Sequence, residues 1–149
     1  MEYKVLNNGL RMPMVGLGVY NISERETQRV VEDAISVGYR SIDTAAMYYN
    51  EKGVGDAVRA CGVPREELFI TTKICDSCYT KEETLRTVDH SMKQLGLDYV
   101  DLMLITGLSE ILPSCGTRSK NSMNKVCSRP LAYQTSIQTP FRRLWMMQR

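Results

Sequence analysis

Residues 39–73 read YRSIDTAAMYYNEKGVGDAVRACGVPREELFITTK, and this stretch decides the class of the fold. Residues 39–43 predict a strand, and residues 68–73 predict another because they are rich in β-branched and aromatic side chains. Residues 51–61 lie between them and predict a helix, and Gly62 follows where a helix commonly ends. A strand, a helix and a strand in this order indicate a parallel βαβ unit.

The same alternation extends toward the N-terminus. Residues 5–12 predict a small hairpin, since their central Asn-Gly supplies the positive φ angles of a tight turn. Residues 15–18 predict a short apolar strand. Ser23 with Glu26 three residues later is typical of a capping box that opens a helix. Gly38 stands where this helix should end, and its expected buried face consists of Thr27, Val30, Val31, Ala34 and Ile35.

The alternation also continues toward the C-terminus. Thr80 with Glu83 predicts a second capping box, and its helix is expected to stop at Gly96. Residues 100–105 predict a fourth strand. Three strand–helix units and a fourth strand indicate an α/β fold with a parallel sheet, either doubly wound or part of a (β/α)8 barrel. The core face of the third helix is expected to carry Leu85, Val88, Met92 and Leu95.

The periodicity ends after Ile105. Residues 107–149 are rich in Ser, Thr, Asn, Arg and Pro and carry seven basic residues against one acid, Glu110, whereas residues 1–106 carry 12 basic and 16 acidic residues. We therefore expect an irregular basic tail over 106–149 that is not a domain. A truncated, frameshifted or misspliced reading frame would explain both the charge split and the lost periodicity. A nucleic-acid-binding tail is a poor explanation, because no recognisable fold or stacking pattern accompanies the charge.

Composition restricts the class of protein further. The chain has 149 residues, 43% hydrophobic and 24% charged, which indicates one globular domain. No apolar run approaches the ~18 residues of a membrane span, and the N-terminus lacks the build of a secretory signal, so a cytoplasmic protein without a membrane partner is expected. Five cysteines without such a signal argue against a disulfide framework. Cys75 and Cys78 form a lone CxxC, which favours ordinary thiols over a zinc or redox site.

Three ionisable side chains fall at or just after the carboxyl ends of predicted strands, where α/β folds place their active sites. Asp43 ends the second strand, Tyr48 follows in the next loop, and Lys73 ends the third strand. Taken singly, each has an ordinary structural role: a turn former, a packed aromatic ring and a solvated cation. Spacing alone leaves open whether they keep these roles or form one catalytic cluster.

The sequence around this cluster resembles a known family. Ile42 to Glu51 (IDTAAMYYNE), followed by Gly53-Val54-Gly55, closely resembles the signature after the second barrel strand of aldo-keto reductases. Further matches follow in the expected order, and together they cover about residues 3–105: Met12-Pro13, Gly16-Leu17-Gly18, Gly38-Tyr39-Arg40, residues 63–69 (VPREELF), 71–73 (TTK) and 95–102 (LGLDYVDL).

The resemblance implies that residues 3–105 supply the first four strands and three helices of a TIM barrel, after an N-terminal hairpin. It also implies NADPH-dependent reduction of a small aldehyde or ketone to an alcohol, with Tyr48 as proton donor and Lys73 and Asp43 as its charged partners. Tyrosine, with its ordinary pKa near 10, is a poor acid at neutral pH. A nearby ammonium stabilises phenolate, and a carboxylate holds the ammonium in place.

The resemblance further implies a cofactor site and a substrate pocket. Gly18, Val19 and Tyr20 match the loop beside the nicotinamide, where Gly18 would let the backbone approach closely. Asp43 belongs to the same cofactor site. Tyr20 and Tyr48 match residues of the substrate pocket, and no metal is implied.

The sequence departs from the family pattern at several points. The family has a histidine directly after the fourth strand, in a His-Trp-Pro run, whereas Ile105 is followed here by Thr106-Gly107-Leu108. The only histidine, His90, falls on the expected polar face of the third helix. Cys75 stands where the family commonly has tryptophan. Strands five to eight of the family have no match in this sequence. The resemblance therefore leaves out most of the family's contacts to the nicotinamide amide and the adenosine 2′-phosphate.

Two interpretations therefore stay open. The first is an NADPH-dependent aldo-keto reductase. The second is a non-catalytic half-barrel that serves as an interaction subunit and associates through open sheet edges.

Overall fold

A four-stranded parallel sheet forms the centre of the molecule. The computed structural model describes residues 1–75 and 81–106, so Thr80 and residues 107–149 of the predicted tail lie outside the described residues. Thr106, predicted as the first tail residue, belongs instead to the fourth strand of the sheet. The strands are adjacent in chain order, with no crossover that skips a neighbour, and Lys73 of the third strand aligns with Leu104 of the fourth. The strands are β3 (Leu17–Gly18), β4 (Ser41–Asp43), β5 (Phe69–Cys75) and β6 (Leu102–Thr106).

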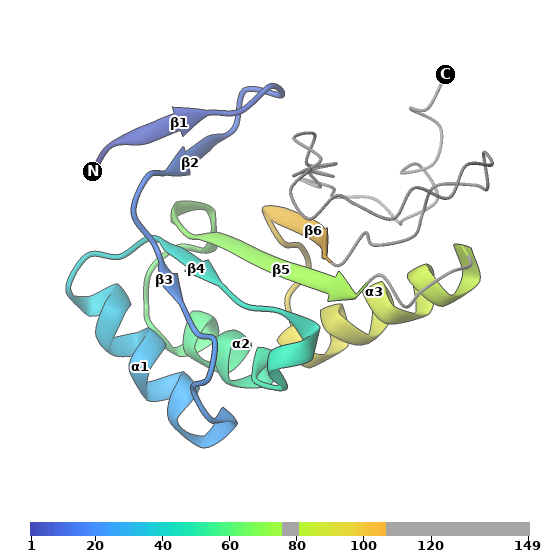
Figure 1. Cartoon of the computed structure of the whole chain (residues 1–149). Helices are drawn as coiled ribbons and strands as arrows, with labels where there is room; N and C mark the ends of the chain where they lie inside the picture. Colours follow the sequence, from blue (N-terminus) through green and yellow to red (C-terminus); the bar gives the residue numbers. More distant parts are fainter. Residues whose placement is uncertain (76–80, 107–149) are drawn as a thin grey trace, which may run out of the picture.

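Three helices connect these strands and lie on the same side of the sheet (Figure 1). A doubly wound fold would place helices on both faces, whereas a barrel places all of them outside. The arrangement confirms the predicted partial (β/α)8 barrel for the described residues. The helices are α1 (Glu24–Ser36), α2 (Glu51–Ala60) and α3 (Lys81–Leu95).

The predicted hairpin precedes the sheet. β1 (Tyr3–Val5) and β2 (Arg11–Pro13) pair antiparallel, with Tyr3 opposite Pro13. Gly9 takes a φ of 88°, which a residue with a side chain rarely adopts and which the Asn-Gly turn requires. The paired residues lie slightly outside the positions expected from the apolar pattern, because the turn region spans residues 6–10.

Helix α1 begins after Ser23 as predicted, but its cap differs in detail. The Ser23 hydroxyl donates to the Glu26 carboxylate at 2.7 Å, so these residues pair through their side chains. Ser23 makes no side-chain hydrogen bond to the helix backbone. Thr27, Val31 and Ile35 are buried, which confirms the centre of the predicted face.

The core lies between the helices and the sheet. Helices α2 and α3 approach so closely that a Cβ placed at Gly55 would lie 1.7 Å from the Leu95 carbonyl oxygen. Only glycine allows this crossing. Among the described residues, no helix combines the length and apolar character needed to cross a membrane. The fully buried side chains include Val19, Val31, Ile42, Val54, Ile70, Leu95 and Val100.

Candidate active site

The structure brings the three predicted strand-end residues together. Asp43 is the last residue of β4, as predicted. The prediction that Lys73 ends its strand is wrong, because β5 continues past Lys73 to Cys75, where it still pairs with β6. Tyr48 closes a short 3-10 helix, η1 (Ala46–Tyr48), which follows β4. β4 and β5 are adjacent parallel strands, so their carboxyl ends meet at one edge of the sheet.

Lys73 is the centre of this cluster. Its ammonium pairs with the Asp43 carboxylate and donates to the Thr44 carbonyl oxygen at 3.0 Å. The same Nζ lies 3.5 Å from the Tyr48 hydroxyl oxygen. The Lys73 side chain is 16% exposed and that of Asp43 is 40% exposed, so the site is partly shielded yet open to a ligand. An ammonium is thus held by a carboxylate and directed at a phenol.

The loop after β3 lies against the phenol. The rings of Tyr20 and Tyr48 have centroids 5.0 Å apart and are tilted by 57°. Val19 is fully buried and its N–H donates to the Asp43 carbonyl oxygen at 3.0 Å, whereas Tyr20 is 66% exposed. A Cβ placed at Gly18 would meet nothing within 4 Å, so the backbone at the end of β3 borders open space. Of the four residues predicted for the cofactor site, Asp43 belongs to the cluster, and Gly18, Val19 and Tyr20 lie beside it.

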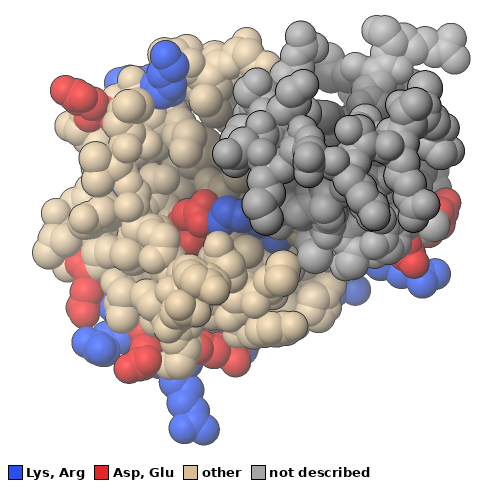
Figure 2. Space-filling model, in the orientation of Figure 1, with Lys and Arg blue, Asp and Glu red and all other residues tan. Residues whose placement is uncertain are grey.

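Figure 2 shows the charge distribution on this side of the molecule. Charged side chains gather mostly along its lower rim, over α1 and α2 of Figure 1, with a smaller group at the upper left. Acidic and basic atoms adjoin in a hollow near the centre of the face.

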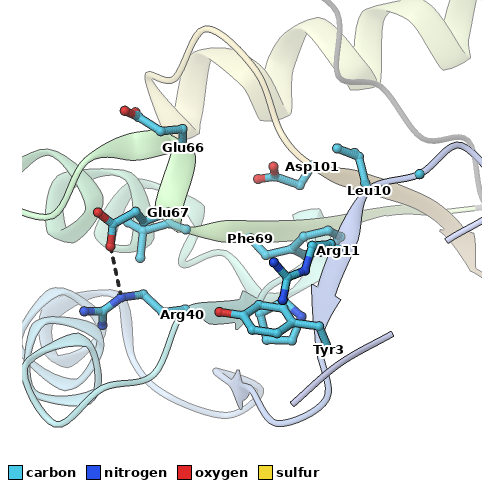
Figure 3. A pocket seen from close by; sticks show the side chains of 11 residues that line it. Tyr3, Leu10, Arg11, Arg40, Glu66, Glu67, Phe69 and Asp101 are labelled. Atoms are coloured by element: carbon cyan, nitrogen blue, oxygen red, sulfur yellow. Dashed lines mark ion pairs between the residues drawn. The ribbon is translucent and has the colours of Figure 1, made fainter. Parts of the chain in front are cut away.

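A separate open pocket of about 460 Å³ lies at the other end of the strands. The hairpin and the residues that lead into β4, β5 and β6 line it (Figure 3). Both of its arginines are engaged with neighbours: the Arg11 guanidinium lies 4.3 Å from the centre of the Tyr3 ring, and Arg40 pairs with Glu67 at 3.9 Å. Active sites of barrels lie at the carboxyl ends of the strands, so this pocket is not the candidate site.

A buried carboxyl group supports the strand that carries Lys73. Glu51, the first residue of α2, is buried and accepts a hydrogen bond from the Thr72 hydroxyl at 2.6 Å. Burial raises the pKa of the Glu51 carboxyl above its ordinary value of 4.5, and the nearby Thr72 and Ser91 hydroxyls and the charge of His90 oppose that effect. His90 itself is exposed, as predicted for the polar face of α3.

Sequence reasoning missed two buried polar residues beside the cluster. Thr44 and Asn50 are both fully buried and hydrogen-bond each other at 2.8 Å. Both stand within the IDTAAMYYNE segment, but an asparagine before a helix is usually taken for a helix cap. Asn50 makes no side-chain cap to α2.

Comparison with known proteins supports the assignment that the sequence suggested. The family model for the aldo/keto reductase family matches residues 14–128. The chain belongs to the aldo/keto reductase family. The match extends beyond residue 105, into the segment predicted to be a tail.

Curated relatives resemble the chain over its N-terminal part. Morphine 6-dehydrogenase of Pseudomonas putida is 52% identical over 100 residues, which is 67% of this chain and 34% of that protein. An aldo-keto reductase of Mycolicibacterium paratuberculosis is 43% identical over 132 residues, which is 89% of this chain and 46% of that protein. The chain thus spans between a third and a half of the length of these relatives.

Solved structures agree on the fold. An aldo/keto reductase from Brucella melitensis matches with a TM-score of 0.67 and 47% identity, over 69% of this chain and 39% of that one. A Bombyx mori aldo-keto reductase in complex with NADP matches with a TM-score of 0.64 and 41% identity, over 69% and 37% of the two chains. The half-barrel of the described residues is therefore an aldo-keto reductase half-barrel, with oxidoreductases among its relatives.

Proposed function

We propose that the chain takes part in the NADPH-dependent reduction of a small aldehyde or ketone to an alcohol, with Tyr48 as proton donor. One observation carries the proposal: the Lys73 ammonium contacts Asp43 and lies 3.5 Å from the Tyr48 hydroxyl oxygen. The pairing of a cation with a phenol at a strand end suits a general acid, because the ammonium favours the phenolate that remains after proton transfer.

The chemistry assigns a separate part to each side chain. The nicotinamide cofactor, when bound, supplies the hydride that reduces the carbonyl carbon. The O–H bond of Tyr48 breaks as its proton moves to the carbonyl oxygen, which becomes the hydroxyl of the alcohol. Lys73 stabilises the phenolate, and Asp43 keeps the ammonium in place. Tyr48 then regains a proton from solvent.

The described residues fit one part of a nicotinamide site. The open backbone at Gly18 and the fixed Val19 N–H leave room for a flat ring to approach the end of β3. Tyr20 beside Tyr48 supplies an aromatic wall for the cofactor or the substrate. The partly exposed Asp43 borders the same space. The Bombyx mori relative in complex with NADP supports the choice of cofactor.

Titration of the purified chain with NADPH tests the proposal, followed by mixing with an aromatic aldehyde. We expect saturable binding and aldehyde-dependent oxidation of NADPH. Lys73→Met should abolish oxidation. The matched control is Lys52→Met, since Lys52 is exposed on α2 and pairs with Asp56; it should behave as the unmodified chain. No binding of NADPH would overturn the proposal and favour the non-catalytic half-barrel.

A further inference from the structure

Asn50 uses its whole amide group to join segments that are distant in sequence. Its Oδ1 accepts a hydrogen bond from the Thr44 hydroxyl at 2.8 Å. Its Nδ2 donates to the carbonyl oxygens of Val19 at 2.9 Å and Ile22 at 3.0 Å. The side chain is fully buried, so water does not compete for these bonds. Both amide protons of an asparagine are thus engaged, and its oxygen has a partner.

This use of the amide is not required by the helix that Asn50 precedes. Asn50 occupies the cap position of α2 but makes no side-chain hydrogen bond to that helix. Its partners Val19 and Ile22 instead lie 31 and 28 residues away along the chain. The amide therefore stabilises the position of the loop after β3 rather than the start of α2.

The conformation of the loop held by Asn50 requires stabilisation by contacts outside the loop. It contains Asn21 with a positive φ of 61° and closes on itself through the Ile22 N–H, which donates to the Val19 carbonyl oxygen at 3.1 Å. The Ile22 carbonyl oxygen also lies 3.5 Å from the Thr27 hydroxyl, a distance that is long for a hydrogen bond. Loss of the Asn50 amide would loosen this end of the loop first.

The other side of Asn50 leads to the cluster. The Thr44 residue that donates to Asn50 also offers its backbone carbonyl to Lys73 Nζ at 3.0 Å. The loop on the opposite side of Asn50 carries Tyr20, whose ring contacts that of Tyr48. One buried amide therefore lies between the backbone that holds the ammonium and the loop that packs on the phenol.

We propose that Asn50 is a positioning residue that fixes the Val19–Ile22 loop against Thr44. It thereby maintains the relative positions of the Tyr20, Tyr48 and Lys73 side chains. Its consequence for catalysis rests on the proposed function, whereas its effect on the loop does not. The Asn50 side chain hydrogen-bonds to Thr44, Val19 and Ile22, so it acts through the Thr44 residue and the loop.

Hydrogen exchange of the full-length chain, followed amide by amide, tests this inference. The Val19 and Ile22 amides report opening of the loop, and the Phe69 and Asp101 amides report the sheet, because they donate to Arg40 and Ile70 across strands. Asn50→Ala should raise the ratio of loop to sheet exchange rates about tenfold, and Thr44→Val, which keeps the side-chain volume, about threefold. Thr72→Val is the matched control: it removes a buried hydroxyl from the neighbouring strand, and its hydroxyl bonds to Glu51 instead of to the loop partners.

The exchange ratios of the three variants decide the proposed role of Asn50. An unchanged ratio in Asn50→Ala and Thr44→Val, or an equal rise in Thr72→Val, would overturn it. If Asn50→Ala does not fold, Thr44→Val decides alone. Where the unmodified chain oxidises NADPH, kcat should fall about ten- to a hundredfold in Asn50→Ala. A chain that neither binds nor oxidises NADPH would remove the proposed function, and the exchange ratio would still decide the role of Asn50.

Discussion

At the scale of single residues, Tyr48 is distinguished by its two neighbours. The Lys73 Nζ lies 3.5 Å from its hydroxyl oxygen and 5.1 Å from the centre of its ring, and the Tyr20 ring packs on it from the other strand-end loop. A tyrosine that serves only for packing requires neither a cation at its hydroxyl nor a second aromatic ring beside it. The combination holds the ring in one orientation while a cation faces the hydroxyl.

Replacement of Tyr48 by phenylalanine keeps the ring and removes the proton. We expect carbonyl reduction to fall by about 10²–10⁴-fold, the usual worth of a positioned general acid, while NADPH affinity changes little. Steady-state turnover and a fluorescence titration measure the two quantities. Tyr49→Phe is the matched control, since Tyr49 is 84% exposed and adjacent in sequence. Unchanged turnover in Tyr48→Phe would move the chemistry to another group.

Glu51 makes a prediction about pH. Its folded-state pKa is raised by burial, so between pH 4.5 and that higher value the folded chain binds more protons than the unfolded chain. The stability that the protonated carboxyl contributes is present below pH 4.5 and is lost as the pH rises through the folded pKa. Glu51→Gln should therefore gain stability relative to the unmodified chain as the pH rises. Urea unfolding from pH 4 to 8 measures the difference, with exposed Glu24→Gln as control for removing a charge; parallel curves for Glu51→Gln would contradict the prediction.

The sequence was informative about some of these residues and silent about others for a physical reason. Asp43 and Lys73 end predicted strands, and parallel strands bring their carboxyl ends together, so their meeting could be predicted. Asn50 has partners 28 and 31 residues away, and no local pattern encodes such bonds. Its position before a helix predicts a cap, which is the local alternative that the long-range bonds replace.

At the scale of elements, helices were predicted more closely than strands. α1 begins one residue after Ser23, and α2 begins at Glu51 as expected, because caps and helical periodicity are local signals. β3 is shorter than the predicted 15–18 segment and pairs with β4 through only Leu17 and Gly18. The length of a strand depends on which neighbouring strand is available for pairing, and the sequence of the strand alone does not determine that neighbour.

The crossing of α2 and α3 yields a prediction at this scale. Gly55→Ala would normally favour a helix by about 1 kcal/mol. Its Cβ would, however, lie 1.7 Å from the Leu95 carbonyl oxygen, which is backbone and does not rotate away. We expect the cost of overpacking to exceed the gain in helix propensity, so that the free energy of unfolding falls by about 3 kcal/mol. Gly18→Ala, where a Cβ meets nothing within 4 Å, should change it by less than about 0.5 kcal/mol; equal effects in urea unfolding would contradict the packing explanation.

At the scale of the whole molecule, composition and the family match give different C-terminal ends for the packed unit. Composition and charge change after residue 105, whereas the family match runs to residue 128. Residues 107–149 offer few periodic apolar positions to offset a backbone ordering cost of about 1–2 kcal/mol per residue. We therefore propose that the unit beginning at residue 3 ends near residue 105.

Limited trypsin digestion distinguishes the two boundaries, because the basic residues are suitably spaced. No Lys or Arg occurs between Lys93 and Arg118, and the next sites that trypsin cleaves are Lys120, Lys125 and Arg142, because Pro130 blocks cleavage after Arg129. A unit that ends near 105 leaves the first three of these sites accessible, so the earliest stable fragment should end at Arg118, Lys120 or Lys125. A unit that includes the whole family match would protect them and give a fragment that ends at Arg142 or later. Mass spectrometry of the fragments measures the end point. Early cleavage only at Arg142 and beyond would show that the segment after residue 105 packs with the half-barrel, and the proposed boundary would then be wrong.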